Sequence, residues 1–174
     1  MGGQRAGAKS QGGSESVMAN TGRIAWDGDA GAAENARREL PRMVADYFAE
    51  GRRVLAATRS ARRLHRLRLK SKNLRYTLEL FRPCYPAGLE DRLAELKKLQ
   101  DWLGASNDAT VAASLLGRKE LKRHPELAEA LEKRAAAQAS AFTRYWKRTF
   151  DAKGQESWWT DFLAKKAREP KAAG

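Results

Sequence analysis

The sequence predicts an all-α protein, an antiparallel bundle of four main helices with short extra helices. Ala, Leu, Arg, Lys and Glu dominate its 174 residues, prolines number only five, and β-branched residues are scarce. Apolar residues recur at helical spacing along most of the chain. The length suits one domain of ordinary size.

Composition divides the chain into three parts. Residues 1–30 are rich in Gly, Ser, Ala and Gln and have almost nothing to bury, which predicts a disordered tail. Within it, Met18 is an alternative start and Trp26 is expected to make a loose contact with the bundle. We expect the helical bundle over residues 31–153, followed over 154–174 by a helical segment and a basic tail.

The first three helices are delimited by apolar spacing and by proline. A first helix is predicted over residues 32–56, and Pro41 either kinks it or marks its true start. A second helix is predicted over 58–82, ending at Pro83 because the residue before a proline avoids the helical conformation. The third, 89–103, carries leucines along one face.

A turn is predicted after the third helix. Gly104 suits a left-handed C-terminal cap. Ser106 or Asn107 then caps a further helix over 107–120, where Asp108 is favoured by the positive end of the helix dipole. Helix capping is therefore preferred to ligand binding as the explanation of Asn107 and Asp108.

Two more helices complete the prediction. The long one covers residues 124–150, and Phe142, Trp146 and Phe150 recur on it every fourth residue, as core-facing side chains do. A short one covers about 156–167, and its two tryptophans are expected to dock it onto the bundle.

The most basic stretch of the chain is residues 52–82. It holds eleven Arg and Lys against one acid, Glu79, and so carries +10 of the net charge of +13. Like charges three or four residues apart on a helix repel by about 0.2–0.5 kcal/mol per pair. Cations gathered at that cost, with almost no carboxylates among them, indicate that the partner is a polyanion.

Helical geometry gathers part of this charge into a ridge. We define the ridge as His65, Arg68, Lys72, Arg75 and Glu79. At about 100° per residue, these side chains fall within about 80° over about four turns, or roughly 21 Å. An apolar face of leucines borders the ridge, so its cations can lie in a partly shielded groove where a phosphate is held strongly. Charge and spacing alone are equally compatible with a solvated face.

Two segments carry residues at the spacing of recognisable motifs. The first is His65-x-x-Arg68-x-x-x-Lys72-x-x-Arg75-Tyr76-x-x-Glu79. The second is Leu96-Lys97-Lys98-Leu99-Gln100-Asp101-Trp102-Leu103-Gly104-Ala105-Ser106-Asn107-Asp108. The first resembles the signature helix of the CHAD family, the conserved-histidine α-helical domain, and the second resembles that family's LxxLQxxLGxxND segment. The resemblance covers roughly residues 33–150. It implies an all-helical domain that binds inorganic polyphosphate through basic side chains, without chemistry of its own.

The resemblance and the charge pattern together imply a polyphosphate site on the second helix. The residues expected to bind polyphosphate are His65, Arg68, Lys72, Arg75, Arg62, Tyr76 and Lys97. No cofactor is expected. A metal site is not expected either, because the two histidines lie in different segments without the spacing of metal ligands.

The chain departs from the family in one respect. Family members usually hold two such repeats related by pseudo-twofold symmetry, with the basic helices facing a central channel. This chain holds one, of the type that usually comes second. A homodimer with two facing ridges would complete the arrangement. The alternatives are binding through one half-site, or a decayed fragment.

Catalysis is not expected. Glu79 has no second acid near it for acid–base work, and there is no GxxxxGK[ST] phosphate loop and no Ser or Cys nucleophile beside a histidine. Glu79 is better explained as a tether that orients Lys72 and Arg75. A phosphohistidine relay through His65 is a remote alternative.

Two other functions compete with polyphosphate binding. Aromatic and basic residues are interleaved over 144–150, so the second candidate is a nonspecific nucleic-acid-binding protein. The third candidate is a structural or adaptor protein whose cations are merely solvated.

The sequence also bears on the location of the protein. Cys84 is the single cysteine, so no intrachain disulfide can form, and it is interpreted as structural. No apolar run approaches the roughly 20 residues that cross a bilayer, and the N-terminus lacks a secretory signal. We therefore expect a cytoplasmic protein, with polyphosphate granules as one location and no membrane partner.

Overall fold

The computed structural model describes residues 25–57 and 60–170, and these contain helices but no strand. The helices are α1 (Ala32–Ala56), α2 (Ala61–Leu80), η1 (Arg82–Cys84), α3 (Gly88–Arg123), α4 (Pro125–Tyr145), η2 (Trp146–Phe150) and α5 (Gln155–Lys166). Of the two short elements, η1 is a 3₁₀ turn and η2 a π-helical turn. The predicted all-α bundle of four main helices with short extra helices is confirmed.

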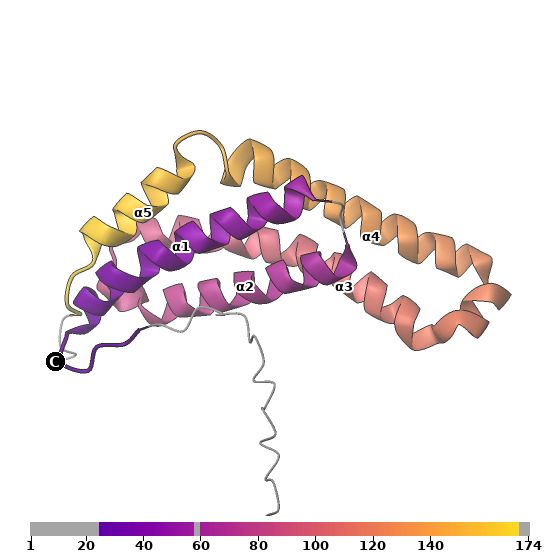
Figure 1. The fold of residues 1–174 in the computed structure, drawn as a ribbon, viewed down its shortest axis with the longest axis horizontal. Coiled ribbons are helices and arrows are strands. Elements are labelled where there is room, and N and C mark those ends of the chain that lie inside the picture. The colour runs from indigo at the N-terminus through magenta and orange to yellow at the C-terminus, as the bar shows by residue number, and fades with distance from the viewer. Residues whose placement is uncertain (1–24, 58–59, 171–174) are drawn as a thin grey trace, which may run out of the picture.

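Successive main helices run antiparallel. In Figure 1, α2 lies beside α1 and α3, α4 returns along α3, and α5 lies on α1. The far ends of α3 and α4 extend past α1 and α2 as a projecting hairpin (Figure 1). Short connections produce this order, because adjacent helices joined by a few residues pack as antiparallel neighbours.

Aromatic side chains fill the centre of the bundle. Phe142, Trp146 and Phe150 are buried, as the four-residue spacing predicted. The Phe150 ring stacks on Phe48 of α1 with centroids 4.8 Å apart, and Trp159 of α5 is buried against Phe150. The aromatic stripe is therefore core, and its rings are not available to stack on nucleic-acid bases.

The predicted break at Gly104 is wrong. Helix α3 runs through Gly104, and the non-helical residue lies later, at Gly117, whose φ is 73°. Consequently the helices predicted over 89–103 and 107–120 are one element, and Asn107 and Asp108 cap nothing. Burial of neighbouring α3 side chains against α2 and α4 outweighs the cost of a mid-helix glycine, which is only about 1 kcal/mol.

The other predicted boundaries fall close to those observed. Pro41 lies inside α1 and does not mark its start. The predicted start of the second helix at residue 58 lies outside the described residues, and Ser60 caps α2 by accepting from the backbone N–H of Arg63 at 3.3 Å. Cys84 is buried in η1, and this burial raises the pKa of its thiol, which keeps the group protonated at neutral pH.

Most of the tail that was predicted to be disordered, residues 1–24, lies outside the described residues, as do residues 171–174. Its last six residues are described and lie against α1. The buried side chain of Asn35 accepts from the backbone N–H of Asp27 at 3.0 Å and donates to its carbonyl. Trp26 stays largely exposed and stacks on Phe81 at 5.9 Å, which is the loose contact expected of it.

Two mid-helix glycines are predicted to respond to alanine with opposite signs. At Gly51 of α1 an added Cβ would overlap the Trp146 ring, so Gly51→Ala should lower the free energy of unfolding by about 1–3 kcal/mol. At Gly104 the nearest atom to an added Cβ is Arg68 Nε at 3.9 Å, an ordinary contact. Gly104→Ala should therefore raise the free energy of unfolding by about 0.5–1 kcal/mol. Urea denaturation measures both, and loss of stability in Gly104→Ala would contradict a continuous α3.

Candidate anion-binding groove

The ridge of α2 lies along its seam with α3. The leucines beside it, Leu67, Leu74 and Leu78, are buried in the core, which fixes the rotation of α2. With those side chains inward, His65 and Arg75 of the ridge contact Asn107 and Gln100 of α3. Three hollows follow one another along this seam, and together they form what we call the α2–α3 groove.

The middle hollow is lined by cations of both α2 and α4. It has a volume of about 360 Å³, and its charged side chains are Arg68, Lys72, Arg134, Asp101 and Asp108. Arg68 and Lys72 are half-buried, and neither forms an ion pair within residues 25–57 and 60–170. Their charge is thus shielded from water on one side and not already satisfied by a carboxylate, which strengthens attraction to an anion.

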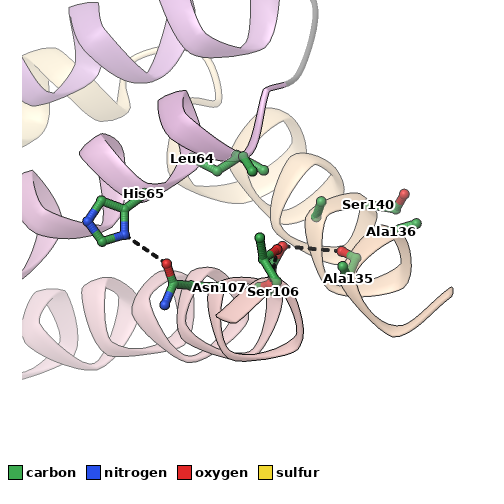
Figure 2. A pocket seen from close by; sticks show the side chains of 10 residues that line it. Leu64, His65, Ser106, Asn107, Ala135, Ala136 and Ser140 are labelled. Carbon is green, nitrogen blue, oxygen red and sulfur yellow. Dashed lines mark hydrogen bonds between the residues drawn. The ribbon is translucent and has the colours of Figure 1, made fainter. Parts of the chain in front are cut away.

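At one end of the groove His65 is oriented by Asn107. The ring Nδ1 and the Asn107 Oδ1 are 2.7 Å apart, and Figure 2 shows the two side chains pointing toward each other from α2 and α3. Since an amide oxygen only accepts, Nδ1 carries the proton and donates. This leaves Nε2 free to donate to a phosphate oxygen when the ring is protonated. Asn107 therefore positions His65 and does not cap a helix.

The hollow beside His65 differs from the middle one. It has a volume of about 320 Å³ and is lined mainly by small side chains of α3 and α4 (Figure 2). The hydroxyl of Ser106, which was predicted as a cap, donates to the Ala135 carbonyl at 3.3 Å and so joins α3 to α4.

At the other end Arg75 is held on three sides. Its Nε donates to Gln100 Oε1 at 2.8 Å, its Nη1 contacts Glu79 Oε1, and its guanidinium lies 4.7 Å from the centre of the Tyr76 ring. Gln100 in turn donates from Nε2 to the Ser71 carbonyl at 2.7 Å. Arg75 is thus preorganised. Glu79 orients Arg75 as predicted, but Glu79 and Lys72, which both lie among the described residues, form no ion pair with each other.

The remaining residues predicted to bind polyphosphate lie at the margin of the α2–α3 groove or outside it. Lys97 lines a third hollow, of about 380 Å³, together with Arg75, but its ammonium pairs with Asp101 at 3.1 Å. Tyr76 is half-exposed beneath Arg75. Arg62 is exposed and lines none of the three hollows.

Sequence reasoning missed three residues of the groove. Gln100 and Asn107 are seven residues apart, which places them on one face of a continuous helix, a signal that the supposed break at Gly104 concealed. Arg134 reaches the middle hollow from α4. Nothing local in the sequence marks Arg134, because its position depends on where α4 turns back.

Comparison with known proteins gives one match. A family model described as CHAD domain matches residues 14–117, which include both sequence motifs and end at the break in α3. No curated protein and no solved structure matches the chain. Within residues 25–57 and 60–170, no cluster of His, Cys, Asp and Glu is able to hold a metal ion. Over the same ranges, no helix has the length and apolar character to cross a membrane.

Proposed function

Because the chain belongs to the CHAD domain family, we propose that it binds inorganic polyphosphate in the α2–α3 groove and catalyses no reaction. The observation that carries the proposal is the middle hollow, where Arg68 and Lys72 are half-buried and unpaired within the described residues and Arg134 joins them from α4. Cations in that state favour an anion over water more than fully solvated cations do.

The form of the groove favours a long, repetitive anion. Its donors extend over nearly three helical turns, or roughly 15 Å, from His65 to Arg75. An extended chain of phosphates supplies charge along this whole length, whereas orthophosphate or pyrophosphate occupies one hollow. Each charge-assisted hydrogen bond contributes about 1.5–3 kcal/mol.

Nucleic acid is the second candidate ligand, since it carries the same backbone charge. The described residues argue against base stacking as a source of affinity, because Phe142, Trp146 and Phe150 are buried. A ligand without bases suits the groove better. Glu79 also supports a binding role over a catalytic one, because its carboxylate is engaged by Arg75.

Pairing with a second copy belongs to the same proposal. A homodimer would supply the second repeat that family members usually carry within one chain. Two half-sites on one particle gain affinity through effective concentration without new kinds of contact. A cytoplasmic location at polyphosphate granules follows from the ligand, and imaging of a tagged chain beside stained granules tests it.

Removal of the groove cations should weaken binding. Arg68→Ala and Lys72→Ala should each cost about 1–3 kcal/mol of binding free energy for long-chain polyphosphate, through loss of a charge-assisted hydrogen bond. Titration calorimetry at physiological salt measures the loss. Arg63→Ala is the matched control, because Arg63 carries the same charge on the same helix but lies exposed away from the groove. Equal losses in control and groove variants would contradict a defined site.

Salt and competition should identify the ligand. The logarithm of affinity for polyphosphate should fall linearly with the logarithm of salt concentration, because binding releases condensed counterions. At physiological salt, long-chain polyphosphate should displace single-stranded DNA of equal charge. A flat salt response excludes the electrostatic mechanism, and displacement in the opposite direction favours the nucleic-acid function.

Binding should also depend on pH through His65. Phosphate favours the protonated imidazole, so affinity is highest where the ring is charged and falls as the pH rises and the proton is lost. Polyphosphate should therefore bind more tightly at pH 6 than at pH 8, measured at constant ionic strength. His65→Gln should remove most of that difference. An unchanged pH dependence in His65→Gln would show that the ring does not contact phosphate.

A further inference from the structure

The projecting hairpin leaves apolar side chains uncovered. Leu115 of α3 is 82% exposed and Val111 is 45% exposed. Figure 1 shows why: α1 and α2 end before this part of α3 and α4, so no third helix among the described residues covers it. Asp108, Val111 and Leu115 are spaced by three and then four residues, which places them on one side of α3. We call this side the hairpin face.

The hairpin face begins where the groove ends. Asp108 lines the middle hollow with Arg68 and Lys72, yet it is exposed and forms no ion pair within residues 25–57 and 60–170. An unpaired carboxylate at this position opposes the binding of an anion. The hairpin face therefore combines two exposed apolar side chains, Val111 and Leu115, with the carboxylate of Asp108, which is unpaired among the described residues.

The distribution of charge favours a second copy of this chain as the partner that covers the hairpin face. The other exposed apolar stripe, on α2, consists of Leu69, Tyr76 and Leu80. Helix α2 carries seven Arg and Lys against one Glu, so two α2 helices repel when they approach. The hairpin, residues 108–134, holds six Arg and Lys against five Asp and Glu. In a chain of net charge +13, the hairpin is a surface on which two copies meet without strong repulsion.

The hairpin face is complementary to itself when two copies run antiparallel. A twofold axis midway between Val111 and Leu115 sets the Val111 of each copy opposite the Leu115 of the other. The same axis brings Asp108 level with Arg118 of the second copy, where α3 breaks after Gly117 and the segment 118–123 begins. That segment carries Arg118, Lys119, Lys122 and Arg123 against Glu120. Apolar contacts thus lie at the centre of the pair and opposite charges at both edges.

We propose that two copies of this chain associate antiparallel through their hairpin faces, and that the basic 118–123 segment of each neutralises Asp108 at the groove of the other. The consequence for the groove rests on the proposed function. With Asp108 paired, Arg68 and Lys72 act on the anion without an opposing charge, and the partner adds its own cations. The pair forms through hairpins, so the repulsion between two facing α2 ridges is avoided.

The apolar centre is tested without any ligand. Sedimentation equilibrium should show a dimer whose dissociation constant rises at least about tenfold in Leu115→Glu, which buries a charge at the interface. Because Leu115 is 82% exposed, circular dichroism should show an unchanged fold. Leu80→Glu is the matched control, since Leu80 is 70% exposed on α2 and lies outside both hairpin and groove. A wild-type chain that stays monomeric at every concentration, or equal effects of the two variants, overturns the proposal.

The charged edges are tested by reversal and rescue. Asp108→Lys should weaken the dimer severalfold, and Arg118→Glu with Lys122→Glu in the same chain should restore it. Absence of rescue overturns the antiparallel pairing.

Polyphosphate separates this proposal from the proposed function. Monomeric Leu115→Glu should bind polyphosphate severalfold more weakly than the wild-type dimer. A dimer that Leu115→Glu disrupts, but that binds no polyphosphate, supports the hairpin interface and defeats the proposed function. Polyphosphate binding by a chain that never dimerises defeats the hairpin interface and supports binding through a single groove.

Discussion

The contact between α2 and α3 determines the remaining organisation of this protein. Helix α2 buries Leu67, Leu74 and Leu78, yet carries seven Arg and Lys, and burial of unpaired charge is costly. The observed rotation meets both demands, because the leucines enter the core while the ridge stays at the seam. Gln100 fixes the seam by accepting from Arg75 and donating to the Ser71 carbonyl. A groove with half-buried cations is the direct result.

The length of α3 gives the groove its second wall and gives the molecule its projecting hairpin. Because α3 continues through Gly104 to Gly117, Gln100 and Asn107 lie on one face and contact two side chains of the ridge, Arg75 and His65. The same continuity carries α3 beyond the start of α2. Beyond that point α3 has only α4 to pack against, and the apolar side chains there are left exposed. Groove and hairpin face are thus two parts of one helix side.

The aromatic core on the other side of α1 supplies the rigidity that a binding groove needs. Phe48, Trp146 and Phe150 pack together where η2 crosses α1, and Gly51 makes room for the Trp146 ring. The π-helical turn places these rings in the core. Since α1 also packs against α2, the groove is supported from behind by this buried aromatic cluster.

The sequence by itself determined the helical class, the bounds of α1, the buried stripe of Phe142, Trp146 and Phe150, and the placement of Arg68, Lys72 and Arg75 on a single helix. Each of these rests on local spacing, because helical periodicity repeats within a few residues. Tertiary structure decided what local spacing cannot encode. Local sequence predicts a helix cap at Gly104, but packing on both sides of α3 outweighs the weak helix propensity of glycine. Helix α3 extends past the end of α2, and α4 then returns along α3. This arrangement leaves Leu115 exposed and brings Arg134 to the groove.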